Sequence, residues 1–171
     1  YFNTKNKMHS YIIRYKSVEF IGKTIVNKDQ EKDSCVEMVF PRYSYTLSDI
    51  SVTTDRYLLQ ITIDLISAVS LCHELKIWHR DIKRDNILIH GRYRAMLIDF
   101  SHSVRIREGN SSPMILDSNV ITYSYRSPEV YAYQRKEIGS YNEKVDIWSL
   151  GIVLFELITG KTFHKLMGNA N

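Results

Sequence analysis

Two stretches near the beginning of the chain have the composition of β-strands. Residues 10–20 and 35–40 are rich in Tyr, Ile and Val, which are residue types favoured in strands. The segment 27–33 between them is polar and predicts a turn. Pro41 ends the second stretch, because proline lacks the backbone N–H that a strand needs. This pattern predicts a β-hairpin.

The spacing of apolar residues changes over 54–75, where it predicts an amphipathic helix. Thr53, Thr54 or Asp55 can cap the start of this helix. The apolar residues recur at intervals of three and four positions and share one face: Leu58, Ile61, Leu65, Ile66, Val69 and Cys72.

A second hairpin and a long loop are predicted in the middle of the chain. The short apolar runs 87–89 and 95–98 flank the polar residues 90–94, which is typical of two strands and a turn. The polar stretch 101–119 predicts a long loop. Loops of this length are usually functional or disordered.

A last helix is predicted over 143–159, and Gly160 is placed to end it. The helix is apolar on nearly every face, which is typical of the centre of a larger body. Only 11 residues follow Gly160, so we expect the C-terminal side of that body to be incomplete. The apolar stretch 145–159 has 15 residues and contains Asp146 and Glu156, whereas a membrane span needs roughly 20 apolar residues. We therefore expect a buried helix and no membrane partner.

The composition is that of an ordinary globular domain. The chain has 171 residues, of which 44% are apolar and 25% charged, and this argues against disorder. The net charge is +4, with Lys and Arg scattered among acids, so a solvated surface is favoured over a site for a phosphorylated ligand. We expect no nucleic-acid partner. Cys35 and Cys72 lie far apart without metal-ligand spacing. They are expected to be reduced thiols of an intracellular protein, in the cytoplasm or the nucleus.

Four short motifs follow one another in the second half of the chain. Residues 79–86 read HRDIKRDN, 99–101 read DFS, 127–129 read SPE and 146–151 read DIWSLG. In this order they resemble the H-R-D-x-x-x-x-N, D-F-G and A-P-E motifs and the central C-lobe helix of eukaryotic-type serine/threonine protein kinases. Four motifs in the right order make this resemblance specific.

The resemblance implies an α+β fold of the protein-kinase type and covers the chain from about His9 to Gly160. Residues 1–43 are then a remnant of the N-lobe β-sheet with the hinge, and residues 44–171 an incomplete, mainly helical C-lobe core. Together they make one partial kinase domain. The chain contains no glycine-rich phosphate loop, strand lysine or partner glutamate in the family's pattern, so the chain alone is expected to be an inefficient kinase.

The resemblance gives polar residues of these motifs roles in phosphoryl transfer, a reaction that depends on positioning and charge stabilisation. Asp81 is expected to take or orient the proton of the acceptor hydroxyl, and Lys83 to neutralise charge on the transferred phosphate. A lysine there resembles serine/threonine kinases rather than tyrosine kinases. Asn86 and Asp99 are expected to bind Mg²⁺, which prefers hard oxygen ligands.

Three neighbouring residues are given supporting roles. His79 is expected to pack beneath the metal-binding loop, and Arg80 to bind an anion of the activation segment. Asp146 is expected to accept hydrogen bonds from the backbone of 79–86, because an unpaired carboxylate in an apolar helix is costly.

An adenine site for ATP is predicted on both sides of the lobe boundary. Phe40, Pro41, Arg42 and Tyr43 resemble the gatekeeper and hinge of kinases. The Pro41 carbonyl and the Tyr43 amide are then expected to face the adenine, with Leu88 beneath it. An aromatic strand end buried in a core remains the alternative for the hinge residues.

The segment 119–129 resembles the cyclin-dependent and dual-specificity-regulated kinases, which have a threonine before Y-R-x-P-E. Thr122 is expected to hydrogen-bond to Asp81 and Lys83 and to form part of the floor for the substrate. Arg126 is expected to help shape the same surface.

Three positions depart from the family pattern. Ser101 replaces the glycine of D-F-G and is expected to restrict the loop, because serine reaches glycine's backbone angles only at a cost. Arg84 replaces a common proline and is expected to be neutral. Asp117 stands where relatives often have a phosphorylatable threonine. It either supplies a permanent negative charge to Arg80 or is a solvated loop residue.

The leading functional prediction is a fragment of a protein serine/threonine kinase that uses ATP and Mg²⁺. It implies a protein substrate and leaves room for a regulatory protein partner. The alternative is a kinase-like interaction module or pseudokinase that binds another kinase or a substrate without catalysis. Small-molecule phosphotransfer is disfavoured, because 122–129 resembles a peptide-docking platform.

Overall fold

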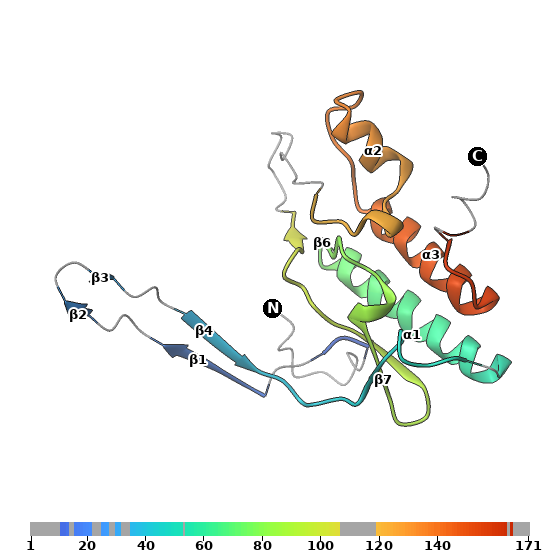
Figure 1. Ribbon diagram of the computed structural model, residues 1–171, viewed down its shortest axis with the longest axis horizontal. Coiled ribbons are helices and arrows are strands. Elements are labelled where there is room, and N and C mark those ends of the chain that lie inside the picture. Colours follow the sequence, from blue (N-terminus) through green and yellow to red (C-terminus); the bar gives the residue numbers. More distant parts are fainter. Residues whose placement is uncertain are drawn as a thin grey trace.

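The computed structural model describes residues 11–13, 16–21, 25–27, 30–31, 35–52, 54–106, 119–163 and 165. Three helices dominate the described part: α1 (Asp55–Glu74), α2 (Pro128–Gln134) and α3 (Lys144–Thr159). Figure 1 shows α1 and α3 side by side, with the strands that follow α1 packed beside it. This body contains every motif residue discussed below.

The predicted N-terminal hairpin is present, but its first strand is shorter than expected. Strand β1 (Ser17–Ile21) pairs antiparallel with β4 (Cys35–Val39), and Ser17 lies opposite Val39. Figure 1 shows this hairpin apart from the helices. The predicted turn also contains two short paired strands, β2 (Ile25–Asn27) and β3 (Gln30–Glu31).

Residues 11–13 were predicted as part of the first hairpin strand and instead lie beside the second hairpin. The Ile13 N–H donates to the Leu97 carbonyl at 3.2 Å, and the Leu97 N–H donates to the Tyr11 carbonyl at 2.8 Å. The side chain of Ile12 is fully buried at this edge. Burial of Ile12 against the central sheet therefore separates this segment from β1.

The central sheet has three antiparallel strands in the order β5-β7-β8, namely Tyr45–Thr46, Ile87–His90 and Arg94–Leu97. The last two strands form the second predicted hairpin. A separate pair, β6 (Ile77–Trp78) with β9 (Val104–Arg105), lies on either side of the motif loops in the sequence. The 79–86 segment therefore begins directly after β6 of one small sheet and ends directly before β7 of the other.

Helix α1 is attached to the central sheet by an ion pair with a buried carboxylate as well as by apolar packing. The carboxylate of Asp64, which is 1% exposed, accepts bonds from Arg94 Nε at 2.8 Å and Arg94 Nη2 at 3.1 Å. It also accepts the N–H of Ala95 at 3.0 Å and Nε2 of Gln60 at 2.9 Å. A buried carboxylate is tolerated when it is paired and hydrogen-bonded in this way.

Helix α3 ends as predicted, at a glycine in the left-handed conformation. Gly160 has φ of 65°, and its N–H donates to the Glu156 carbonyl at 2.9 Å. One face of the helix is buried against the core. The side chains of Ile147, Trp148 and Ile158 are exposed. The helix was expected to be buried on every face, but the described residues cover only one of its faces.

Helix α2 was not predicted, because its seven residues show no apolar period long enough to detect. It begins directly after Ser127, with Pro128 at its first position, where the missing N–H of proline costs nothing. Val130 buries its side chain in a second cluster with Ile121, Tyr141 and Val145. This cluster attaches the 121–130 segment to the start of α3.

The two neighbouring residues Leu65 and Ile66 test which face of α1 is in the core. Leu65 is 1% exposed and Ile66 is 51% exposed. We expect Leu65→Ala to lower the free energy of unfolding by about 2–5 kcal/mol, because the substitution leaves a cavity. The matched variant Ile66→Ala is expected to change it by no more than ~0.5 kcal/mol. Urea unfolding of the protein measures both values, and equal losses would contradict the packing described here.

Candidate active site

The 79–86 segment folds as a loop between β6 and β7 and closes around the carboxylate of Asp81. Asp81 Oδ1 accepts a bond from Thr122 Oγ1 at 2.6 Å, and Oδ2 lies 2.8 Å from Lys83 Nζ. Lys83 Nζ also donates to Thr122 Oγ1 at 3.1 Å. Three side chains from two distant segments therefore form one network, and the contacts expected of Thr122 are present.

The charge state of Asp81 follows from these neighbours. Burial alone raises the pKa of Asp81, but the hydrogen bonds from Lys83 and Thr122, the charge of Lys83 and the bond from Asn86 outweigh it. The pKa of this carboxyl is therefore below its ordinary value. At neutral pH the site holds a carboxylate, which is the form that accepts a proton.

Asn86 lies at the end of the same loop, in a short 3₁₀ turn (Arg84–Asn86). Its Nδ2 donates to the backbone carbonyl and to Oδ2 of Asp81, both at 2.8 Å. These bonds fix the orientation of the amide, whose oxygen is the atom expected to bind Mg²⁺. The N–H of Ile98 donates to the Asn86 carbonyl at 3.0 Å, which holds the loop next to Asp99.

Asp99 is held in a left-handed backbone conformation with φ of 61°, which aspartate adopts more readily than most residues. Its Oδ1 accepts bonds from Ser101 Oγ at 2.6 Å and from the Ser101 N–H at 3.2 Å. The Ser101 hydroxyl is the largest cause that lowers the pKa of Asp99, and burial opposes it only in part. Asp99 is therefore ionised at neutral pH.

The oxygen donors of Asn86 and Asp99 fit a Mg²⁺ ion, which usually takes one or two protein oxygens and completes its shell with phosphate and water. The described ranges contain no group of three or more His, Cys, Asp and Glu residues that would hold a metal ion by themselves. A metal at this place would accordingly depend on the phosphates of a bound nucleotide.

The expected backbone cost of Ser101 is not present in this structure. Among the described residues, Ser101 is not one of the non-glycine residues with positive φ. The conformation here needs no glycine at this position, since the left-handed residue is Asp99. Instead of only restricting the loop, Ser101 adds a hydroxyl that bonds to Asp99.

A buried carboxylate from α3 holds the start of the 79–86 loop. Asp146 Oδ2 accepts the N–H of His79 and Oδ1 accepts the N–H of Arg80, both at 2.8 Å. Nε2 of His73, at the end of α1, lies 2.9 Å from Oδ2 of the same carboxylate. Asp146 is 1% exposed, so these partners take the place of water around it.

His79 supports the loop as a neutral ring. Burial lowers its pKa more than the neighbouring carboxylates raise it. The N–H of Asp81 donates to Nδ1 at 3.3 Å, so the ring proton is on Nε2, which donates to the Ile98 carbonyl at 2.9 Å. The His79 and Phe100 rings pack edge to face, with their centroids 4.7 Å apart. His79 thus packs under the segment that presents Asp99, as the resemblance implied.

The predicted hinge residues lead directly into the strand beside Leu88. Phe40, Pro41 and Tyr43 lie between β4 and β5, and Thr46 of β5 pairs with Leu88 of β7. Ile87 and Ile89 point into the core, whereas the alternate Leu88 is only partly buried on the opposite side of the strand. The Phe40 side chain is 41% exposed, so it does not fill a core in the described structure.

Two residues contribute to the site in ways that the sequence did not indicate. Arg84, expected to be neutral, donates Nη2 to the carbonyls of Leu47 at 2.8 Å and Ile50 at 3.2 Å. His73 contacts Asp146, and the only sequence signal for it is its position four residues after Val69 on the buried face of the predicted helix. Asp117 lies outside the described residues.

Residues 3–170 match the family model for the protein kinase domain. The match covers almost all of the chain, which therefore belongs to the protein kinase family. The geometry around Asp81, Asn86 and Asp99 is consistent with this membership.

Two curated relatives are kinases of modest sequence identity. The chain is 36% identical over 130 residues to the probable cell division protein kinase of Encephalitozoon cuniculi, covering 74% of this chain and 46% of that protein. It is 34% identical over 135 residues to the serine/threonine-protein kinase PEPKR2 of Arabidopsis thaliana, covering 76% and 27%. The chain thus spans less than half the length of these relatives.

A solved structure supports the fold. A chain of the yeast RNA Pol II CTD kinase CTDK-1 complex matches with a TM-score of 0.67 at 22% identity, covering 90% of this chain and 46% of that one. This confirms the protein-kinase-like α+β fold that the motifs predicted. In the part of the chain that the structure describes, no helix has the length and apolarity to span a membrane.

The hydroxyl of Ser101 gives a measurable prediction for Asp99. In Ser101→Ala, the pKa of Asp99 is expected to rise towards the ordinary aspartate value, because its strongest hydrogen bond is lost. The lowered pKa of folded Asp99 stabilises the fold above the unfolded pKa, and this stabilisation is lost as the pH falls through the folded pKa. The variant should therefore lose less stability on acidification.

NMR titration of the side-chain carboxyl carbons measures this shift. The matched control is Ser103→Ala, because the Ser103 hydroxyl donates to the Phe100 carbonyl at 2.7 Å and not to Asp99. If Asp99 titrates at the same pH in Ser101→Ala as in the parent protein, the hydrogen bond does not set its pKa.

Proposed function

We propose that this chain is part of a protein serine/threonine kinase, which transfers the γ-phosphate of ATP to Ser or Thr hydroxyls of proteins. The observation that carries the proposal is the network of Asp81, Lys83 and Thr122, in which every bond is 3.1 Å or shorter. Its side chains provide a base, a cation and an orienting hydroxyl in one place. Phosphoryl transfer needs positioning and charge stabilisation of this kind.

Asp81 receives or orients the proton of the substrate hydroxyl in this proposal. Its carboxylate is ionised and is fixed by bonds from Thr122, Lys83 and Asn86, so it is already positioned before a substrate arrives. Lys83, held at 2.8 Å, provides a positive charge close to the atoms that react. The lysine at this position favours serine and threonine over tyrosine as acceptors by resemblance.

The cofactors in this proposal are ATP and Mg²⁺. The metal supplies charge neutralisation for the phosphates, and Asn86 and Asp99 are the residues that would hold it. The adenine would lie between the hinge and Leu88, with the backbone of Pro41 and Tyr43 facing its edge. The pairing of Thr46 with Leu88 supports this arrangement, because it brings the hinge strand next to β7.

A binding module without catalysis is the competing proposal. The bonds among Asp81, Lys83, Asn86 and Thr122 speak against it, because a module that only binds needs no precise geometry around an ionised carboxylate. The chain covers 46% and 27% of the two kinase relatives, so the transfer activity is proposed for a whole protein and not for this chain alone.

Two substitutions in the same loop test the proposal. In the full-length protein, Asp81→Asn is expected to reduce phosphorylation of a protein substrate by roughly 10²- to 10⁴-fold, because the proton acceptor is removed. The control Asp85→Asn removes an exposed carboxylate four residues away and should retain most of the activity. Radiolabelled phosphate transfer from ATP measures both.

Nucleotide binding separates the two proposals. An active kinase should bind ATP with Mg²⁺ in both Asp81→Asn and Asp85→Asn, since neither residue is a proposed metal ligand. A full-length protein that binds substrate proteins but neither binds ATP nor transfers phosphate would overturn the kinase proposal and favour the binding module.

A further inference from the structure

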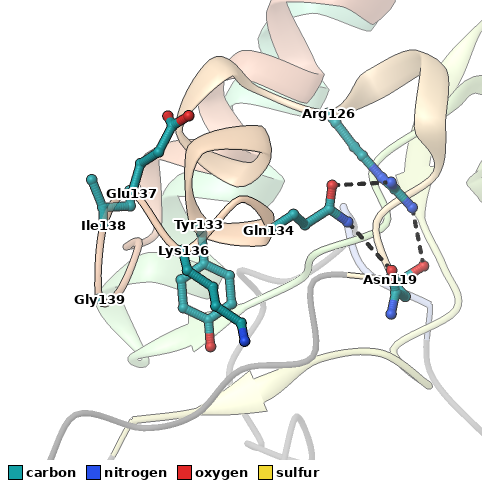
Figure 2. A pocket seen from close by; sticks show the side chains of 8 residues that line it. All are labelled: Asn119, Arg126, Tyr133, Gln134, Lys136, Glu137, Ile138 and Gly139. Carbon is teal, nitrogen blue, oxygen red and sulfur yellow. Dashed lines mark hydrogen bonds between the residues drawn. The ribbon is translucent and has the colours of Figure 1, made fainter.

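A polar hollow of about 850 Å³ lies beside the candidate active site, between the segment before α2 and the turn after it. Its volume is in the range of ligand-binding clefts, roughly 300–1,000 Å³. Figure 2 shows the eight described residues that line it: Asn119, Arg126, Tyr133, Gln134, Lys136, Glu137, Ile138 and Gly139. None of these residues has a part in the network around Asp81.

Arg126, which lines the hollow, also bonds to the segment that carries Thr122 of the Asp81 network. Arg126 Nε donates to the Ile121 carbonyl at 2.8 Å. The residue after Ile121 is Thr122, whose hydroxyl bonds to Asp81. A peptide that places its acceptor hydroxyl at Asp81 therefore has neighbouring residues within reach of the hollow.

The lining has an excess of positive charge. The only acid among its eight described residues is Glu137, and both of its oxygens are bonded to Arg135, at 2.5 and 2.8 Å. Arg126 instead donates to neutral oxygens, namely the carbonyls of Ile121 and Asn119 and Oε1 of Gln134. The charges of Arg126 and Lys136 are thus not balanced by the acid of the lining.

The cations and the acid also lie in different parts of the hollow. Figure 2 shows Arg126, Gln134 and Asn119 joined by hydrogen bonds on one side and Glu137 on the other. In this view the side chains of Lys136 and Tyr133 extend away from that of Glu137, with an amine at the end of one and a hydroxyl at the end of the other. Hydrogen-bond donors with positive charge suit a carboxylate.

We propose that this hollow binds an acidic side chain of the protein substrate, close to the Ser or Thr that receives the phosphate. The proposal rests on the proposed kinase function and adds a substrate class to it, namely proteins with Asp or Glu near the acceptor. Lys136 is the specificity residue that can be tested most directly, because it is exposed and because the bonds to the Ile121 and Asn119 carbonyls come from Arg126.

Peptide binding to the full-length protein tests this proposal without depending on catalysis. Fluorescent serine peptides with Asp at each flanking position in turn are compared with isosteric peptides that have Asn there. At one position the Asp peptide should bind roughly 1.5- to 5-fold more tightly, which is the effect of an exposed ion pair. The preference should decrease at high salt, because the Debye length falls from about 8 Å at 0.15 M to about 3 Å at 1 M.

Charge variants assign the preference to the hollow. Lys136→Gln is expected to bring the Asp-to-Asn affinity ratio close to one, and Lys136→Glu to invert it. The matched control Lys161→Gln removes an exposed lysine after α3 and should leave the ratio unchanged. An equal ratio in Lys136→Gln and the parent protein, or no Asp preference at any position, would overturn the proposal.

Two further measurements keep the outcomes distinct. A phosphoserine peptide that binds through Lys136 while the Asp peptides show no preference would overturn the assignment to a carboxylate. ATP binding in the presence of Mg²⁺ is measured in the same preparations. If the protein shows the Lys136-dependent Asp preference but does not bind ATP, only the proposed kinase function is overturned. If it binds ATP but shows no such preference, only the acidic-substrate proposal is overturned.

Discussion

The candidate site depends on the buried carboxylate of Asp146. It accepts the backbone N–H groups of His79 and Arg80 and contacts the ring of His73, so one side chain connects α3, the end of α1 and the loop between β6 and β7. Hydrogen bonds to a charged group are worth about 1.5–3 kcal/mol each. These bonds also remove the cost of a bare carboxylate in an apolar interior.

The bond to Arg80 is important because this residue has φ of 68°. Non-glycine residues in the left-handed region cost on the order of 1–3 kcal/mol, and persist where the surroundings fix them. Asp99, with φ of 61°, has the same conformation on the facing loop. The bond from the Ile98 N–H to the Asn86 carbonyl holds the segments of these two residues together. The Asp146 carboxylate of α3 thus helps to hold Arg80 in this conformation.

Two departures from the kinase pattern become understandable through their contacts. A serine at position 101 would be costly if the backbone there needed glycine, because serine has a Cβ atom. The left-handed residue is instead Asp99, and the Ser101 hydroxyl bonds to its carboxylate. Arg84 in place of proline reaches the carbonyls of Leu47 and Ile50 and ties the loop to the segment after β5. Arg84 thus adds a contact between segments, whereas Ser101 adds one within its own loop.

The segment around Thr122 is less regular than the strands around Leu88, since it contains only a 3₁₀ turn and the short helix α2. Residues 121–130 are held by the small cluster of Ile121, Val130, Tyr141 and Val145, and by the Tyr125 hydroxyl, which donates to Glu156 at 3.0 Å. Burial raises the pKa of Tyr125, and the charge of Glu156 adds to this effect. The platform beside Thr122 is therefore attached to α3 as well, so the same helix supports both loops that meet at Asp81.

The sequence by itself determined the long elements and the motif chemistry. Apolar periodicity located α1, and a long apolar stretch followed by Gly160 located α3, each to within a residue or two. Two short apolar runs around a polar turn located β7 and β8. These patterns are local. The motif residues determined the kinase family, because their order along the chain is itself the signal. The hairpin of β1 and β4 was predicted, although the extent of β1 was not.

Only the tertiary structure decided which distant groups meet. The attachment of Ile12 to the central sheet, the Asp64–Arg94 ion pair and the contact of His73 with Asp146 join residues that no local pattern connects. Helix α2 and the charged hollow beside it also escaped prediction, since a helix of seven residues is too short to show a period. Side-chain pairing across the fold depends on packing in three dimensions, and for this reason the sequence identified the chemical groups but not their partners.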